Sequence, residues 1–340
     1  MYLIKKIYKE KYIKKNTGLF LIYFITILLQ YFFSVQVKAE FKKGQLQVAT
    51  RKVQLLTQLR AEQCGAPRAF DNPRGIYDDN DNEVLYVIAK PSGPVYKFDL
   101  RNDYKFLEEI GTGTAFSNDL MDIRVSENGD IYVVDARKNQ IFIFNAEGNL
   151  KQIINAKDNR KKKEKELGIV SIDFNNKGDI FLSDRGGQGV QVLDAEGNYL
   201  YQIVKVSSGK EEFGFPSISQ LKLNSNDDIY VLDNLMYKVI KFTPKGKTLL
   251  IFGGRGDAAG KFIDATGMNI DNKDRIYIVE QLTGTIQVFD RDGNFLHVLV
   301  NENEGRLVLD SPSRIALDKT GRIYVMEPMR DRLTVLKSID

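Results

Sequence analysis

A pattern of roughly 47 residues recurs six times along this chain. Each copy has a Gly- or Asp-type turn, an aliphatic–aromatic pair and a short apolar run, and the pairs are Leu85-Tyr86, Ile131-Tyr132, Ile180-Phe181, Ile229-Tyr230, Ile276-Tyr277 and Ile323-Tyr324. Successive aromatic residues lie 46, 49, 49, 47 and 47 positions apart. A near-constant period of this size, with several short strands per unit, is typical of a β-propeller. The repeats favour one all-β domain, because a single unit cannot bury its own apolar face.

The second unit, Leu120 to Ile154, shows the predicted blade most clearly. Its alternating and apolar segments predict four strands, at 121–125, 130–134, 140–144 and 149–154. Asn128-Gly129 and Glu147-Gly148 supply the turn residues between them. Since the same order of turns and strands recurs over residues 65–340, the sequence predicts a propeller of six four-stranded blades.

The last unit ends after its third strand, because only Lys337 to Asp340 remain. An open strand edge must be covered. Residues 40–64 precede the first unit and contain an alternating segment, Val53 to Leu59. We therefore expect 40–64 to be a linker and a ring-closing strand, with Val53–Leu59 as the fourth strand of the sixth blade.

Residues 1–39 have the composition of a targeting segment. Seven lysines accompany an uncharged run of 18 residues from Gly18 to Val35, and Val37-Lys38-Ala39 places small residues before a potential cleavage point. The segment is predicted to be either a cleaved signal peptide or an uncleaved signal anchor. Both alternatives predict export, to the periplasm or the extracellular space, or to the outer side of the cytoplasmic membrane. An uncleaved segment would itself be a membrane contact.

Charge excludes one class of partner. Of the formal net charge of +4, residues 1–39 contribute +6, so the remainder of the chain carries −2. A nearly neutral domain lacks the electrostatic attraction that dominates nucleic-acid binding, and no nucleic-acid partner is expected. The one cysteine, Cys64, excludes an intramolecular disulfide.

Several segments resemble the NHL repeat. These are residues 129–135 with 138–144, Phe252-Gly253-Gly254-Arg255-Gly256, and the turns Pro73-Arg74-Gly75-Ile76 and Pro312-Ser313-Arg314-Ile315. The resemblance covers about residues 65–337. It implies a six-bladed propeller of a kind used to bind proteins, peptides, glycans or nucleic acid. If the chain resembles the related propeller lyases and hydrolases in activity as well, the resemblance implies a site in the central tunnel. Such a site would use histidines, or a calcium ion held by Glu, Asn and Asp.

The residues offer little for catalysis. The only histidine, His297, lies in a predicted outer strand, so a multi-histidine zinc site is impossible and a Ser-His-Asp triad is badly placed. Acidic residues follow the second strand of five units, and these are Asp135, Asp184, Asp233, Glu280 and Glu327. They would either bind a cation near the channel or accept hydrogen bonds from loop backbone N–H groups. Their repetition favours the second role.

The remaining candidate is a face of loops. Loops between second and third strands should gather on one side of the ring with the inter-blade loops, and Arg and Tyr are favoured in binding sites. The predicted binding face consists of Arg137, Lys138, Arg185, Tyr237, Lys238, Arg330 and Arg332. The first hypothesis is an exported, non-enzymatic binding or scaffold propeller that recognises a protein or cell-envelope ligand through this face. It predicts no catalytic residue, no metal ligand and no cofactor.

The alternative hypothesis is a calcium-dependent, lactonase-like hydrolase or a lyase, with its site at the central channel. It makes calcium the one cofactor candidate. The observation that separates the two hypotheses is a bound divalent ion held by acids from several blades.

Overall fold

The computed structural model describes residues 48–156, 168–187, 189–209 and 211–339. The chain divides into two units, Met1–Gln47 and Val48–Asp340, and the described residues all belong to the second. The predicted signal peptide or anchor over residues 1–39 lies outside the described residues. In the ranges described, no helix is long and apolar enough to cross a membrane.

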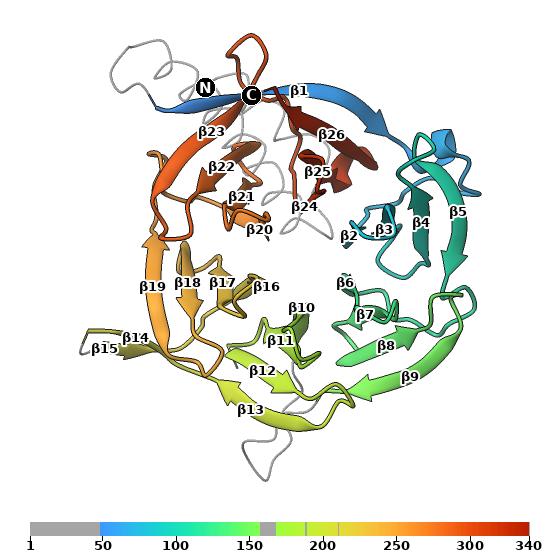
Figure 1. Cartoon of the computed structure of the whole chain (residues 1–340), viewed down its shortest axis with the longest axis horizontal. Helices are drawn as coiled ribbons and strands as arrows, with labels where there is room; N and C mark the ends of the chain where they lie inside the picture. The colour runs from blue at the N-terminus through green and yellow to red at the C-terminus, as the bar shows by residue number, and fades with distance from the viewer. Residues whose placement is uncertain (1–47, 157–167, 188, 210, 340) are drawn as a thin grey trace, which may run out of the picture. The chain divides into compact units, whose positions relative to one another are not determined.

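The second unit is a propeller of six four-stranded antiparallel blades around a common centre (Figure 1). Blade one contains β2 (Ile76–Asp79), β3 (Val84–Ile88), β4 (Val95–Asp99) and β5 (Lys105–Ile110). Blade two contains β6 (Leu120–Val125), β7 (Ile131–Asp135), β8 (Gln140–Phe144) and β9 (Leu150–Asn155). Blade three contains β10 (Ile169–Phe174), β11 (Ile180–Asp184), β12 (Gly189–Leu193) and β13 (Tyr199–Ile203).

The other three blades complete the ring. Blade four contains β16 (Ile218–Leu223), β17 (Ile229–Asp233), β18 (Lys238–Phe242) and β19 (Thr248–Gly253). Blade five contains β20 (Ala265–Ile270), β21 (Ile276–Glu280), β22 (Thr285–Phe289) and β23 (Phe295–Asn301). Blade six contains β24 (Arg314–Leu317), β25 (Arg322–Glu327), β26 (Arg332–Ser338) and β1 (Thr50–Leu59). A small hairpin, β14 (Val206–Ser208) and β15 (Glu211–Phe213), and two 3-10 helices, Ala61–Cys64 and Pro328–Arg330, lie between strands.

The N-terminal strand β1 closes the ring. It pairs antiparallel with β26, and Val53 to Leu59 face Ser338 to Leu333, so the segment expected to be the fourth strand of blade six occupies that place. It also pairs in parallel with β23, where Thr50 to Val53 face Val298 to Asn301. The second pairing, which the repeat pattern does not indicate, joins blades five and six into one eight-stranded sheet (Figure 1).

Packing between blades explains the strand pattern of the sequence. The second strand β7 is buried at every residue, whereas most of the outer strand β9 is exposed. Tyr132 and Val134 of blade two share one apolar cluster with Ile169 and Ile172 of blade three. Each blade therefore buries its apolar face on the next blade, as the repeat pattern predicts.

Candidate functional site

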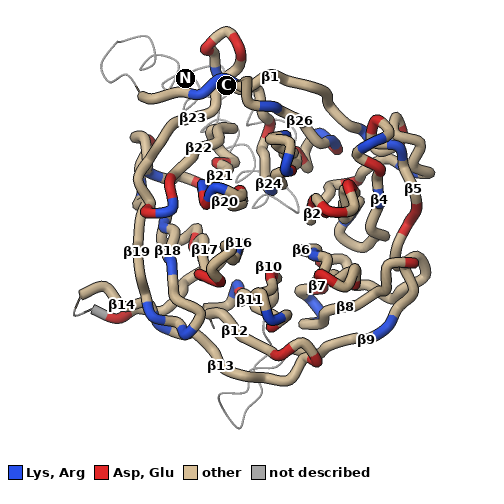
Figure 2. The backbone as a smooth tube through the Cα atoms, viewed as in Figure 1, with Lys and Arg blue, Asp and Glu red and all other residues tan. Residues whose placement is uncertain are grey.

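The six innermost strands surround the centre of the ring. They are β2, β6, β10, β16, β20 and β24, and each lies beside the next. Basic and acidic residues both occur on these strands (Figure 2). In β6 the apolar Ile123 and Val125 pack in the cluster shared with blade one, while the alternate residues Asp122 and Arg124 are polar and buried.

Strand register places the residues at the corresponding alternate positions of the six inner strands in two rows around the centre. The first row lies opposite the repeated aromatic residues of the second strands and consists of Tyr77, Arg124, Asp173, Lys222, Asn269 and Ala316. The second row lies two residues earlier in each strand and consists of Gly75, Asp122, Ser171, Gln220, Gly267 and Arg314. The first row has six different residue types and the second row has five, so the blades differ from one another at the ring centre.

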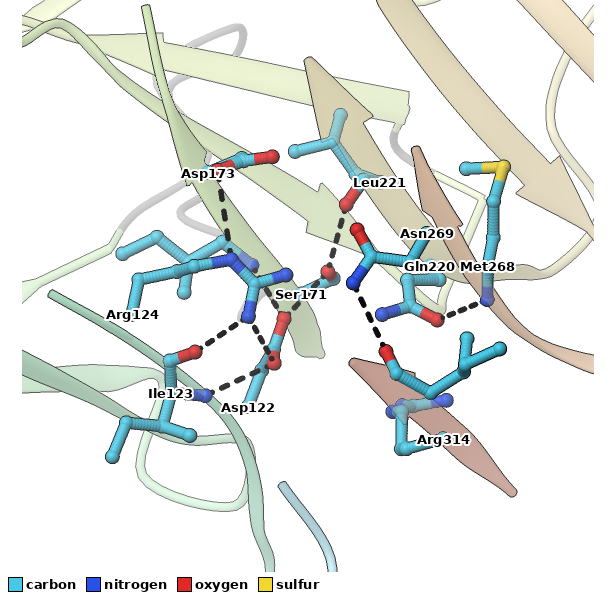
Figure 3. A network of polar contacts seen from close by, with 12 residues as sticks. Asp122, Ile123, Arg124, Ser171, Asp173, Gln220, Leu221, Met268, Asn269 and Arg314 are labelled. Atoms are coloured by element: carbon cyan, nitrogen blue, oxygen red, sulfur yellow. Dashed lines mark hydrogen bonds and ion pairs between the residues drawn. The ribbon is translucent and has the colours of Figure 1, made fainter. Parts of the chain in front are cut away.

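Polar side chains of one inner strand bond the backbone of the next (Figure 3). Asp122 Oδ2 accepts hydrogen bonds from Ser171 Oγ (2.7 Å) and Ile172 N (3.2 Å). Gln220 Oε1 accepts from Met268 N (2.6 Å). Asn269 Nδ2 donates to the Ile315 carbonyl (3.2 Å). These bonds connect blades two to three, four to five and five to six at their inner edges.

Arg124 is the central cation of this network. Its Nη1 lies 3.2 Å from Asp122 Oδ1, its Nε lies 3.5 Å from Asp173 Oδ1, and its guanidinium lies 5.5 Å from the centre of the Tyr77 ring. Burial raises the pKa of Asp122, but the charges of Arg124, Lys222 and Arg314 outweigh burial and hold that pKa below its usual value. Asp122 is therefore an ionised carboxylate that is fully engaged.

Lys222 and Arg314 have no carboxylate of their own. Burial and the charge of Arg124 lower the pKa of Lys222 to about 8. Burial lowers the pKa of Arg314, whose Nη1 donates to the Thr266 carbonyl (2.7 Å). The inner rows thus hold three buried cations and two carboxylates, Asp122 and Asp173. Such a set repels a further cation and attracts an anion.

A calcium ion of the kind implied by the family resemblance does not fit this centre. Both carboxylates are paired with Arg124, and Asp173 Oδ2 also accepts from Leu223 N (2.9 Å). Asn269 uses both amide atoms, since its Oδ1 accepts from Ile270 N (2.8 Å). No group of three or more His, Cys, Asp or Glu residues in the described ranges is placed to hold a metal ion.

The repeated acids after the second strands hold loops, as predicted. Asp135 accepts hydrogen bonds from Ser117 N (2.7 Å), Ser117 Oγ (2.5 Å) and Lys138 N (3.0 Å). Asp233 accepts from Ser217 N, Leu235 N and Met236 N at 3.0–3.1 Å. Each acid therefore binds the preceding inter-blade loop to its own blade, and in these two cases it also orders the loop between the second and third strands.

The acids of blades three, five and six use the same arrangement. Asp184 accepts from Gly168 N (2.5 Å), and Glu327 accepts from Asp310 N (2.6 Å). Glu280 accepts from Ile263 N (3.1 Å) and Asp264 N (3.0 Å), and burial raises its pKa to about 7. The two classes of loop thus form one ordered face of the propeller.

The predicted binding-face residues lie on this loop face, but they differ in availability. Arg137 and Lys138 are exposed, and Lys138 donates to the Ala115 carbonyl. Arg185 is exposed and lies 3.2 Å from Asp119, and Arg330 is exposed and lies 2.5 Å from Asp310. Both partners belong to inter-blade loops of the same face.

The remaining three residues of the predicted face are more enclosed. Tyr237 is half-buried, with the Arg255 guanidinium 5.5 Å from its ring centre, and Lys238 Nζ lies 5.7 Å from the Phe213 ring centre. Arg332 forms two hydrogen bonds to Glu327 (2.9 and 3.0 Å) and one to Gln58 (2.9 Å). Arg332 is therefore held mainly by Glu327 of β25 and also by the ring-closing strand.

His297 lies on the outermost strand β23, opposite Val288. Burial, together with Arg51 and Arg275, lowers its pKa to about 4, so the imidazole is neutral at physiological pH. Its position at the rim agrees with a structural role. The inner-strand residues, in contrast, were not selected from the sequence, although their signal was present as polar residues at alternate positions of the first strands.

Comparison with solved structures supports the fold. Virginiamycin B lyase from Staphylococcus aureus is 15% identical with a TM-score of 0.55, over 85% of this chain and 100% of the other. A gluconolactonase from Xanthomonas campestris is 13% identical with a TM-score of 0.57, over 78% and 86%. An auxiliary nutrient binding protein from Bacteroides ovatus is 13% identical with a TM-score of 0.61, over 86% and 78%.

No protein-family model matches the sequence, and no curated protein matches it. The similarity to solved structures is therefore one of fold, shared with lyases, lactonases and a nutrient-binding protein. Assignment to the NHL family in particular stays a prediction from the sequence. This chain is a six-bladed β-propeller of the kind that those proteins share.

Proposed function

We propose that this protein is a non-enzymatic binding propeller that recognises a protein or cell-envelope ligand through its loop face. The observation that carries the proposal is the set of buried acids that fix the loops of that face. Asp135 alone orders both Ser117 and Lys138, one from each class of loop. A preorganised surface loses little conformational entropy on binding.

The exposed cations favour an acidic ligand. Arg137, Lys138, Arg185 and Arg330 are exposed on this face. The pairs that Arg185 and Arg330 form with Asp119 and Asp310 are largely solvated. Exposed ion pairs contribute only about 0–1 kcal/mol, so a ligand carboxylate or phosphate can replace the acid partner.

Export is part of the proposal and rests on residues 1–39. A lysine-rich segment before an uncharged run of 18 residues is typical of export signals. A periplasmic, extracellular or membrane-anchored protein would meet cell-envelope ligands directly. The auxiliary nutrient binding protein from Bacteroides ovatus, which has a similar fold, supports the use of this fold for binding.

The experiment compares two triple charge reversals in the full chain. Arg137→Glu, Arg185→Glu and Arg330→Glu change the loop face. Lys177→Glu, Lys273→Glu and Lys319→Glu make the same charge change on exposed turns between first and second strands, at the opposite end of the blades. Binding to solubilised envelope material from the producing cells is measured by surface plasmon resonance. We expect the loop-face variant to lose about tenfold or more in affinity, and the control to lose little, apart from its general charge effect.

An equal loss of affinity in both variants would mean that only net charge matters. Full affinity in the loop-face variant would exclude this face as the binding surface. The enzymatic alternative receives no support from the ring centre, because its carboxylates are engaged by Arg124. A calcium-dependent rise in the melting temperature would reopen that alternative.

A further inference from the structure

Three buried cations approach the ring centre from alternate blades. Arg124 belongs to β6 of blade two, Lys222 to β16 of blade four and Arg314 to β24 of blade six. Their exposed fractions are only 2%, 7% and 8%. Buried like charges destabilise a fold unless opposite charges lie near them. The three cations therefore need negative charge close to them.

The protein's own two acids do not balance three cations, although Asp122 and Asp173 both act on Lys222 and Asp122 acts on Arg314. Asp122 and Asp173 both form ion pairs with Arg124. Lys222 forms no hydrogen bond or ion pair with any residue that the structure describes, and the described contact of Arg314 is a neutral carbonyl, that of Thr266. Two of the three cations thus have no direct ion pair within the described residues, and two carboxylates face three cations.

Unused donors remain on the same side chains. Arg124 Nη2 and Arg314 Nε are buried and make no hydrogen bond within the described residues. Arg74, whose charge also acts on Arg314, has a buried Nε in the same condition. Buried polar groups are nearly always hydrogen-bonded in native proteins, to protein, water or ligand. Several unpaired cationic donors around one centre indicate a bound acceptor.

The chemistry of that acceptor follows from the donors. A guanidinium presents parallel N–H groups that match the oxygens of carboxylate or phosphate, and an ammonium adds a compact charge. A divalent cation is disfavoured, because both nearby carboxylates already bind Arg124. We propose that the ring centre binds one small oxyanion, a phosphate or carboxylate group, held by Arg124, Lys222 and Arg314.

This site lies on the inner strands rather than on the loops, and it does not depend on the proposed function. Arg314 is the first residue of β24, and Arg74 precedes β2, so both lie at the end of the inner strands where the inter-blade loops enter. An anion would reach the centre from that end. A phosphate or carboxylate group of a larger ligand could therefore enter, as well as a free ion.

The first test is thermal unfolding of the full chain at pH 7 in phosphate, acetate or chloride of equal ionic strength. A ligand that binds only the folded state raises the melting temperature. We expect phosphate or acetate to raise it by roughly 3 °C or more above chloride, and the larger of the two shifts identifies the preferred oxyanion. Equal melting temperatures in all three salts would overturn the proposal.

A matched pair of variants locates the effect. Lys222→Met removes the unpaired cation and keeps a long apolar side chain, so it should raise the melting temperature in chloride and lower affinity for the preferred oxyanion about tenfold by isothermal titration. Lys241→Met is the control in the same blade, because Lys241 pairs with Asp228 at 2.9 Å. The control should lose stability in every salt and keep the oxyanion shift.

A full oxyanion shift in Lys222→Met would overturn the proposal, as would an equal loss of stability in all salts, since a purely structural lysine behaves in that way. If Lys222→Met does not fold, Arg314→Gln provides the same comparison. A double variant of the loop face, Arg137→Glu with Arg330→Glu, leaves Arg185 unchanged because its charge acts on Arg314. This variant should keep the oxyanion shift, so failure of the proposed function and failure of this proposal are distinguishable.

Discussion

The loop acids and the inner-strand rows are both rings of polar residues, but they differ in one respect. The position at the end of the second strand is Asp or Glu in five of six blades. In all five blades the side chain accepts a hydrogen bond from a loop N–H group. The first inner row has six different side chains in six blades. Residues that every blade needs for folding are repeated, whereas residues that serve one site need not be.

Blade one shows what happens without the repeated acid. Ala89 stands at that position, and the preceding loop is held by a backbone bond from Asp71 N to the Ala89 carbonyl (2.9 Å). The blade still forms, with Ala89 buried at 3% exposure. A repeated residue can thus be replaced where the backbone supplies the contact itself.

The largest effect is expected from opening the ring at blade six, whose fourth strand comes from the N-terminal segment β1. Deletion of residues 41–60 removes β1 and exposes the edges of both β23 and β26. We expect the deletion variant to lose more than about 5 kcal/mol of unfolding free energy, which is the whole stability of many domains. We also expect it to aggregate through its open strand edges. Urea unfolding and size-exclusion chromatography would show this.

A point substitution separates loss of the edge from loss of chain length. Val53 is 1% exposed in β1, and Val53→Asp should cost about 3 kcal/mol or more through an unpaired buried carboxylate. Leu55 is 52% exposed in the same strand, and Leu55→Asp should change stability by less than about 1 kcal/mol. A deletion protein that melts like the parent would contradict ring closure by β1.

A smaller effect is expected at a repeated acid. Asp135→Ala leaves Ser117 N and Lys138 N without their acceptor, and we expect a loss of about 2–3 kcal/mol in unfolding free energy. Asp292→Ala removes an exposed turn carboxylate and should cost less than about 0.5 kcal/mol. If the two variants unfold at the same urea concentration, the loop acids do not fix the loop face.

The fold was predictable because its causes are local and repeated. Turn residues such as Asn128-Gly129 and apolar second strands such as 131–135 occur in register through the chain, and Gly129 has the left-handed φ of 80° that the turn requires. The role of the loop acids was predictable for the same reason, since five equivalent positions argue for one shared task. The parallel pairing of β1 with β23 was not, because it depends on the position of blade five beside blade six.

The ring centre was missed because repetition gives no information there. Arg124, Lys222 and Arg314 lie in three different units and in two different rows, so no spacing rule connects them. Only closure of the ring brings them to one centre. Departures from the repeat at otherwise regular positions are the signal that could have identified them.

One further departure supplies the smallest expected effect. Asp78 of β2 lies opposite Leu85, in the register position that Val125, Phe174 and Leu223 occupy in blades two to four. It is 7% exposed, and both of its carboxylate oxygens are without a hydrogen bond within the described residues. Burial, with the negative charges of Asp318 and Asp79, raises the pKa of Asp78 to about 8.

This raised pKa makes the stability of the folded protein depend on pH. The folded protein retains on Asp78 a proton that the unfolded chain releases near pH 4. The unfolding free energy should therefore fall as the pH rises from about 4 to 8, and Asp78 should cause no further fall above pH 8. Asp78→Asn removes this dependence. We expect no gain over the parent at pH 4 and a gain of roughly 1–3 kcal/mol at pH 9 by urea unfolding. Asp81→Asn, on an exposed residue of the turn that follows β2, should show no such growth with pH. A pH-independent difference for Asp78→Asn would mean that Asp78 is ionised throughout.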